Sequence, residues 1–400
     1  MSKKQVRVDQ LKLGMYVVEL DRPWLGTPFL FQGFPLTAQH QIDEIARFCK
    51  TVFVDVERST DVVQKARASA AGPELVRGDT LYPTGSVVEV EVPRAKSVYG
   101  ACELAVRSIV QRLRSEDRLD VKTLTQAVND ITESVLRNPD AMLLLARVRQ
   151  KGEYEFSRAV DTSVLMITFG RFLQLAHEQL TVLGLAGMLL DVGKLRVADD
   201  ILKKTGVLAP DEYEQAKKHV LHSVEILEKE RELPREVAAI VLQHHERHDG
   251  SGYPRGLKGA EITLYGGIAG IVDTYSALIS QRPYAEQESP SNALSKLYKL
   301  RGTLFNEALV EQFIQCIGIY PVGSVVELNT GEIGVVIGQN TVRRLQPRVM
   351  VVLDRQRKPL KPHKILDLLK EPRATPEEPY RIRRTLPAET LPVEAREFFL

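Results

Sequence analysis

Residues 244–254 read HHERHDGSGYP, and this stretch decides more about the fold than any other part of the chain. Two adjacent histidines are followed by an acid and then by a Gly-Tyr-Pro turn. Each imidazole carries polar nitrogens that need partners when the ring is buried. A histidine pair beside a glycine-rich turn therefore indicates a site for a divalent metal ion. The residues of the turn itself are expected to shape the loop rather than to do chemistry.

The composition is that of an ordinary soluble protein with more than one domain. A chain of 400 residues exceeds one ordinary core, which predicts two or three domains. The net charge of +2 argues against a global attraction to nucleic acid or membranes. No apolar run approaches the roughly 18 residues of a membrane span, and the N-terminus lacks an apolar signal core. The three cysteines are far apart in the sequence, so we expect reduced thiols in a cytoplasmic protein.

Periodicity divides the chain into a β-rich start and a long helical region. VRVDQL, MYVVEL and TVFVDVE within residues 1–60 have strand patterns, and TAQHQIDEIARFCK between the last two has a helical one. Residues 61–96 are poor in order signals and are typical of a linker. Apolar residues then recur at three- and four-residue spacing, which predicts a helical connector over 97–149 and an all-α domain over 150–318.

The pattern changes again near Pro321. Short strands around an Asn-Thr-Gly-Glu turn predict a small β module over 319–370. Residues 371–400 are rich in proline and polar residues, so we expect an extended or disordered tail. The basic stretch 343–364 contains no aromatic residue, which favours a solvated surface over a DNA-binding one.

Four ordered motifs across roughly residues 150–318 resemble the HD-GYP phosphodiesterases, the branch of the HD metallohydrolases that cleaves cyclic di-GMP. Besides HHERHDGSGYP, they are LLDVGKL at 189–195, LKKTGVLAPDEYEQAKKH at 202–219 and IAGIVDTYSALISQRPY at 268–284. The first 60 residues are similar to a β-rich domain of unknown function that often precedes HD-GYP domains. The resemblance implies an all-α HD-GYP core between an N-terminal β-rich domain and a small C-terminal β module.

The resemblance also implies a set of metal ligands. HD-GYP proteins hold two or three ions, commonly iron or manganese, on His and Asp side chains, a donor set that suits such metals. The matching residues in this chain are Asp191, His219, His244, His245 and Asp273. His222 lies three residues after His219, so an alternative is that His219 is a surface residue.

Two family ligands are missing. The family pattern Leu-His-Asp-x-Gly-Lys has Leu190 in the histidine position, and the first family histidine falls on or near Arg158. Ser276 replaces the aspartate of a downstream Asp-Ala-Leu. In the family both missing histidines serve one metal together with the counterparts of Asp191 and Asp273. The resemblance therefore predicts that this site is lost and that one site remains, with the four ligands Asp191, His219, His244 and His245. The guanidinium of Arg158 cannot ligate a metal, but its charge could lie against Asp191 and Asp273 in place of the cation.

The loss of one metal predicts impaired catalysis. Two-metal phosphodiester hydrolysis uses both ions, and removing one typically costs roughly two or more powers of ten in rate. Lys194 matches a family lysine that faces the substrate phosphate, and Arg282 matches an arginine that contacts the nucleotide. Asp191 and Lys194 are thus the expected catalytic residues. Alternatively, Lys194 complements the end of a helix and Arg282 forms a salt bridge.

The sequence leaves three functions open. The first is a degenerate HD-GYP signalling protein that holds one iron or manganese ion or none, binds cyclic di-GMP, and contacts other signalling proteins such as diguanylate cyclases. The second is an active cyclic di-GMP phosphodiesterase with a reduced site. The third is an interaction module that binds no nucleotide. HD-GYP proteins are often dimeric, so the resemblance is compatible with a homodimer.

Overall fold

The computed structural model divides the chain into two compact units, residues 1–74 with 342–345 and the rest. It describes residues 3–22, 34–36, 39–55, 75–116, 118–148, 154–280, 287–340, 343, 345–387 and 390–391. Among the helices in these ranges, none has both the length and the apolar character needed to span a membrane.

In the described part of the N-terminal unit, an antiparallel sheet is accompanied by helix α1 (Gln39–Phe48). Its strands are β1 (Lys3–Arg7), β2 (Tyr16–Leu20), β3 (Phe34–Pro35) and β4 (Thr51–Asp55), in the spatial order β1-β4-β2-β3. Helix α1 (Gln39–Phe48) precedes β4, and the short 3-10 turn η1 (Val8–Gln10) follows β1. Alternate strand residues and one face of α1 form a shared apolar core. The three strands and the helix predicted from the sequence are confirmed.

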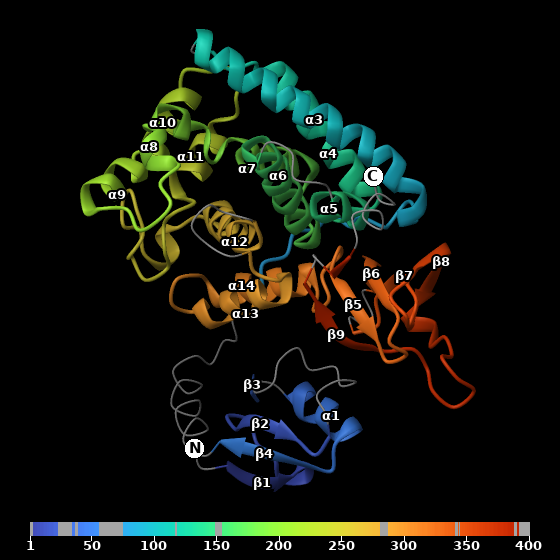
Figure 1. Cartoon of the computed structure of the whole chain (residues 1–400). Coiled ribbons are helices and arrows are strands. Elements are labelled where there is room, and N and C mark those ends of the chain that lie inside the picture. The colour runs from blue at the N-terminus through green and yellow to red at the C-terminus, as the bar shows by residue number, and fades with distance from the viewer. Residues whose placement is uncertain are drawn as a thin grey trace. The chain divides into compact units, whose positions relative to one another are not determined.

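The second unit is mostly helical, and the predicted helical region is confirmed (Figure 1). Its helices before the histidine-rich motif are α3 (Val88–Glu116), α4 (Val121–Arg137), α5 (Pro139–Val148), α6 (Tyr154–Phe172), α7 (His177–Leu189), α8 (Asp199–Leu202), α9 (Pro210–Lys217), α10 (His219–Leu227) and α11 (Arg235–Gln243). After it come α12 (Leu264–Ile279), α13 (Pro290–Leu300) and α14 (Glu307–Ile317). The 3-10 turns η2 (Val192–Arg196) and η3 (Gly259–Glu261) lie between them.

Close helix packing places α6 and α7 side by side at the centre of this unit. A Cβ atom on Gly187 would lie 2.8 Å from the Cα atom of Ser163, so a side chain at Gly187 would force the helices apart. The Ser163 hydroxyl donates to the Gly184 carbonyl across the same contact at 2.9 Å. This contact fixes α6, which carries Arg158, against α7, which ends just before Asp191.

Helix α3 begins at Val88, inside the segment 61–96 that the sequence predicted to be a linker. The buried Glu91 carboxylate accepts hydrogen bonds from the Arg137 guanidinium, the shortest at 2.9 Å, and from the Ser134 hydroxyl at 2.8 Å. These partners on α4 lie more than forty residues further along the chain. Local order signals do not report such a long-range stabilisation, so the linker prediction was wrong from residue 88 onward.

A five-stranded antiparallel sheet follows the helices, in the order β8-β7-β6-β5-β9. Its strands are β5 (Val325–Leu328), β6 (Ile333–Gly338), β7 (Arg348–Leu353), β8 (Pro359–Asp367) and β9 (Ile382–Leu386), with the 3-10 turn η4 (Leu368–Lys370) after β8. The predicted hairpin joins β5 to β6. Strand β9 lies in the predicted tail and pairs with β5, where Arg384 also binds the buried Glu327 carboxylate at 2.8 Å. The tail prediction was wrong there because this pairing is non-local.

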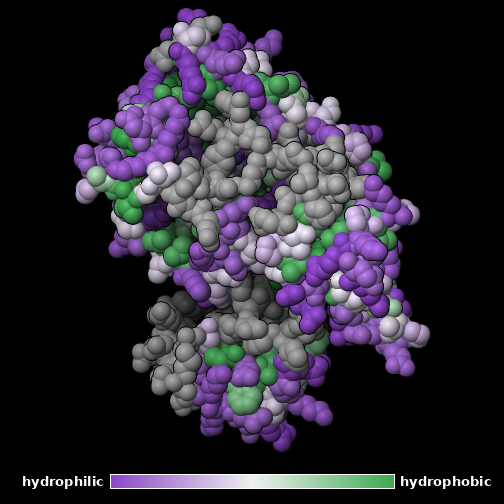
Figure 2. Space-filling view, in the orientation of Figure 1, coloured by the Kyte–Doolittle hydropathy of each residue, from purple (hydrophilic) through white to green (hydrophobic). Residues whose placement is uncertain are grey.

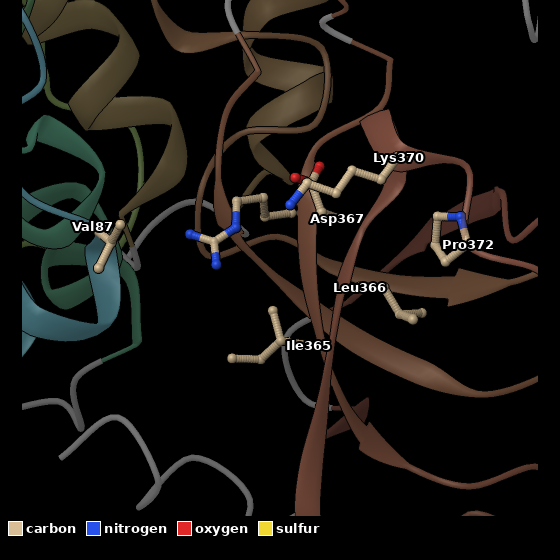
Figure 3. A pocket seen from close by; sticks show the side chains of 7 residues that line it. Val87, Ile365, Leu366, Asp367, Lys370 and Pro372 are labelled. Atoms are coloured by element: carbon tan, nitrogen blue, oxygen red, sulfur yellow. The ribbon is translucent and has the colours of Figure 1, made fainter.

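Polar contacts between described residues fasten the β module to the helices. The Arg348 guanidinium pairs with Glu89 at the start of α3, and the backbone N–H of Gln339 donates to the Asp140 carboxylate on α5 at 2.9 Å. A pocket of about 570 Å³ lies beside the first of these contacts, with Val87 on the helix side and Ile365, Leu366 and Asp367 on the module side (Figure 3). On the visible face of the molecule, hydrophilic side chains surround small, separate hydrophobic areas (Figure 2).

Candidate metal centre

The end of α7 and the turn η2 place Asp191. The backbone N–H of Gly193 donates to the Ser223 hydroxyl on α10 at 2.8 Å, and this hydroxyl donates to the Leu190 carbonyl at 3.2 Å. A Cβ atom on Gly193 would lie 2.1 Å from the carbonyl oxygen of His219, so only glycine permits this approach. Asp191 is therefore held against the first residue of α10, which is His219.

Two histidines are oriented by backbone carbonyls. The Nδ1 atom of His219 lies 2.7 Å from the carbonyl oxygen of Ala216, and that of His244 lies 2.6 Å from the carbonyl oxygen of Val241. Because a carbonyl only accepts, each Nδ1 carries the proton and donates. Each Nε2 then keeps its lone pair, and both Nε2 atoms are buried without a hydrogen-bond partner among the described residues. This is the arrangement in which histidine ligates a metal.

The Nε2 atoms of His219 and His244 lie close to ligand atoms of two further residues, Asp191 and His245. Ligand atoms of Asp191, His219, His244 and His245 all lie within 4.8 Å of one another. The Oδ1 atom of Asp191 is also buried, has no hydrogen bond to any residue that the structure describes, and faces Nε2 of His219 at 3.4 Å. Orphaned buried acceptors are costly unless something positive lies between them. The donor set of three imidazoles and one carboxylate thus fits a divalent transition metal.

The protonation states agree with metal ligation. Burial lowers the pKa of His219 to about 4, and burial also lowers the pKa values of His244 and His245. Burial alone would raise the pKa of Asp191, but the charges of Lys194 and Arg158 outweigh it and hold that pKa well below its ordinary value. Near neutral pH the imidazoles are therefore neutral and the carboxylate is charged, as metal binding requires.

The other half of the site is occupied by Arg158. Its guanidinium forms ion pairs with both carboxylates, through Nη1 to Oδ2 of Asp191 and through Nη2 to Oδ1 of Asp273 at 2.6 Å. Lys194 binds the same Oδ2 atom of Asp191 at 2.8 Å. The expected placement of Arg158 against the two carboxylates is confirmed. Asp273 reaches the histidines only at its other oxygen, 3.9 Å from Nδ1 of His245.

The remaining expected positions have different surroundings. Leu190 is buried at the end of α7, and Ser276 is buried on α12 with its hydroxyl 3.4 Å from that of Thr162. Neither side chain is a metal ligand. Arg282 lies outside the described residues, so its expected role stays a prediction.

Sequence reasoning missed the residues that hold the Gly-Tyr-Pro loop. The buried Glu246 carboxylate accepts the backbone N–H groups of Arg255 at 2.8 Å and Leu257 at 2.9 Å. A Cβ atom on Gly252 would lie 2.5 Å from the carbonyl oxygen of His245, so the loop packs directly on the ligand segment. An acid between two motif histidines and a glycine-rich turn was the available signal, because such a turn leaves backbone N–H groups to be satisfied.

Three ranges of the chain match known protein families. The HD domain family matches residues 141–309, a domain of unknown function matches residues 3–124, and a KOW domain associated with HD domains matches residues 325–375. The expected N-terminal domain of unknown function is thereby confirmed.

Relatives with assigned activities match as well. A cyclic di-GMP phosphodiesterase of Pseudomonas aeruginosa is 33% identical over 370 residues, which cover 91% of this chain and 89% of the relative. A cyclic di-GMP phosphodiesterase of Thermotoga maritima is 39% identical over 136 residues, covering 34% of this chain and 37% of the relative. A solved HDG"Y"P protein of Bdellovibrio bacteriovorus is 14% identical with a TM-score of 0.47, covering 78% of this chain and 98% of that protein.

Proposed function

Because the chain belongs to the HD-GYP family of HD-domain proteins, we propose that it binds cyclic di-GMP at a site with one divalent metal ion and hydrolyses it slowly or not at all. The ion would be iron or manganese, held by Asp191, His219, His244 and His245. This proposal combines the substrate of the relatives with the side chains that this chain has in its own site.

The observation that carries the proposal is the position of Arg158. Its guanidinium lies between Asp191 and Asp273, the two carboxylates that the resemblance assigns to the second metal. Arg158 and Lys194 supply two positive charges against two carboxylates, so this half of the site is already neutral. A second divalent ion would have to displace a guanidinium whose side chain is only 14% exposed.

One oxygen of Asp191 remains for a metal. Arg158 and Lys194 both bind Oδ2, whereas Oδ1 faces the histidines and has no hydrogen bond among the described residues. An ion held there supplies positive charge to a phosphoryl oxygen. Arg158 provides fixed charge but no ligand and no bound water, so it stabilises the fold of the site without replacing the chemistry of a second ion.

Lys194 is the residue of this site best placed to meet a phosphate. Its side chain is 40% exposed, more than that of Asp191, to which it is bound at 2.8 Å. An ammonium has three donors, so the contact with Asp191 leaves others for a phosphate oxygen. Lys194 would therefore bind and orient the phosphodiester, with Arg282 as the proposed second contact.

Metal content and turnover of the full chain test the proposal. We expect about one equivalent of iron or manganese per chain, measurable cyclic di-GMP binding and negligible turnover. Near two equivalents with robust hydrolysis to the linear dinucleotide or GMP would establish the alternative, an active phosphodiesterase with a reduced site. No metal and no nucleotide binding would establish the other alternative, an interaction module.

The proposal also includes the domain boundaries, the location of the protein in the cell and its partners. We assign residues 1–60 to the N-terminal domain, residues 150–318 to the HD-GYP domain, and residues 319–370 together with strand β9 to the β module. The free thiols of Cys49, Cys102 and Cys316 support a reducing, cytoplasmic location. Output through other signalling proteins, such as diguanylate cyclases, and a homodimer complete the proposed scheme.

A further inference from the structure

A row of aromatic rings leads outward from the metal ligands. The ring of Tyr253 lies against that of His245, with centroids 4.8 Å apart and planes 33° from parallel. The Nζ atom of Lys217 lies 5.5 Å from the centroid of Tyr253 and 5.2 Å from the centroid of Tyr213. The ammonium therefore joins two tyrosine rings, of which the inner one touches a metal ligand.

The outer ring is fixed relative to the metal site. Tyr213 and Lys217 lie on α9, and a single residue, Lys218, separates the end of α9 from the start of α10 at His219 (Figure 1). The start of α9 is fastened by Glu212, whose carboxylate accepts the backbone N–H of Ala209 at 2.7 Å and binds Lys204 at 2.5 Å. A helix held at both ends presents its side chains in one geometry.

Tyr213 is nevertheless not a core residue. It is 50% exposed, one of the large hydrophobic or aromatic residues that the described surface leaves open. The Lys217 side chain is only 24% exposed and also pairs with Glu214 at 2.5 Å, so the cation is held in place between the rings. An exposed aromatic ring beside a fixed cation is the combination with which proteins stack nucleobases, because every base has a π-face.

We propose that Tyr213, set by Lys217 and Tyr253, is the stacking platform for one guanine base of the cyclic dinucleotide. The inference rests on the proposed binding of cyclic di-GMP and adds the residue on which the base stacks. The phosphodiester lies at the metal ligands and Lys194, and the base extends along the row of rings to Tyr213. Tyr213 is thus a base-binding residue, with no part in holding the metal.

Two probes separate base recognition from phosphate recognition. Cyclic di-GMP and inorganic phosphate are titrated calorimetrically into the metal-loaded full chain and into Tyr213→Ala. We expect the variant to bind cyclic di-GMP about tenfold more weakly, in the range for loss of one base–aromatic stack, with unchanged phosphate affinity and metal content. Tyr213→Phe keeps the ring and should bind like the parent.

Tyr298 on α13 provides the matched control. Its ring is also covered by a cation, with the Arg301 guanidinium carbon 3.6 Å from the centroid, so Tyr298→Ala removes the same kind of contact elsewhere. This control should bind both probes like the parent. Unchanged cyclic di-GMP affinity in Tyr213→Ala, or equal weakening of both probes, would overturn the platform alone. A parent chain that does not bind cyclic di-GMP would overturn the proposed function and the platform with it.

Discussion

The Oδ1 atom of Asp191 and the Nε2 atom of His219 face each other at 3.4 Å, and neither has a hydrogen bond among the described residues. Both are acceptors, because the proton of His219 is on Nδ1, which donates a hydrogen bond to the carbonyl oxygen of Ala216. Two buried acceptors in contact are unfavourable until a cation lies between them. The other carboxylate oxygen, Oδ2, already has its cations in Arg158 and Lys194. Asp191 thus has one oxygen, Oδ1, that lacks a positive partner and one oxygen, Oδ2, whose charge Arg158 and Lys194 already balance.

Removal of the Arg158 charge should make stability depend on metal. In Arg158→Gln, Asp191 and Asp273 lose their shared guanidinium, and breaking such a buried pair typically destabilises a protein by about 3–5 kcal/mol. Manganese should restore part of the loss, so the rise in melting temperature on adding metal should be larger in the variant than in the parent. Thermal melts with and without manganese measure both quantities.

Arg196→Gln is the matched control for that change. Arg196 lies on η2 and pairs with Glu225 at 3.1 Å, but the Glu225 side chain is 59% exposed, so the pair contributes little to stability. Its metal-dependent rise should equal that of the parent. An equal rise in Arg158→Gln would mean that the guanidinium does not compete with an ion.

Restoring both missing histidines should rebuild the second metal site. The double variant Arg158→His with Leu190→His should bind a second equivalent of metal and gain cyclic di-GMP turnover, whereas each single change should do little, because ligands act as a unit. Leu190 is buried, so an unpaired imidazole there costs about 1–3 kcal/mol and folding must be checked by a melt. A folded double variant with one metal and no turnover would show that more of the site has changed.

Gly193 should tolerate no side chain. In Gly193→Ala the new Cβ atom meets the His219 carbonyl oxygen at 2.1 Å, so η2 must move away from α10. We expect a loss of about 1–3 kcal/mol in the free energy of unfolding and weaker metal binding, since overpacking displaces backbone. Gly85→Ala is the control, because nothing lies within 4 Å of its added Cβ atom. Urea unfolding and metal titration of the two variants should differ clearly, and equal behaviour would contradict the steric argument.

Asp140 should give the β-module contact a pH dependence. Burial raises the pKa of Asp140 to about 6, although its hydrogen bond from Gln339 opposes the rise. As pH falls, the carboxyl of Asp140 therefore binds its proton at a higher pH in the folded chain than in the unfolded chain. The ionised carboxylate destabilises the fold above about pH 6, and this cost decreases as pH falls below that value. Asp140→Asn keeps an acceptor for Gln339 and should gain melting temperature relative to the parent at neutral pH, with the gain shrinking toward about pH 4. A gain that is constant with pH would contradict this.

The convergence of the four candidate metal ligands could be predicted from the sequence because these residues lie in local motifs. His219, His244, His245 and Asp191 each belong to a short stretch with a recognisable pattern, and they converge within 4.8 Å. The contact of Arg158 with both carboxylates could also be predicted, because an arginine replaced a ligand whose carboxylate neighbours remained.

The residues that position the ligands could not be predicted from the sequence, because their partners lie far away along the chain. Ser223 holds Gly193 and Leu190 across about thirty residues of chain, and no local pattern marks such a serine. The start of α3 at Val88 and the strand β9 depend on partners still further away, Arg137 and the strand β5. In each case, contacts with residues distant in the sequence determine the observed structure, and local propensity does not predict them.

The two hydrogen bonds from the Gly-Tyr-Pro loop to Glu246 couple the position of that loop to the position of the candidate metal ligands. Glu246 follows His245 directly, and it grips the loop at Arg255 and Leu257. A protein that docks on this loop and pulls it outward would transmit the displacement to His245 through a single peptide unit. A change in the position of the loop would therefore alter the placement of His245 among the four candidate ligands.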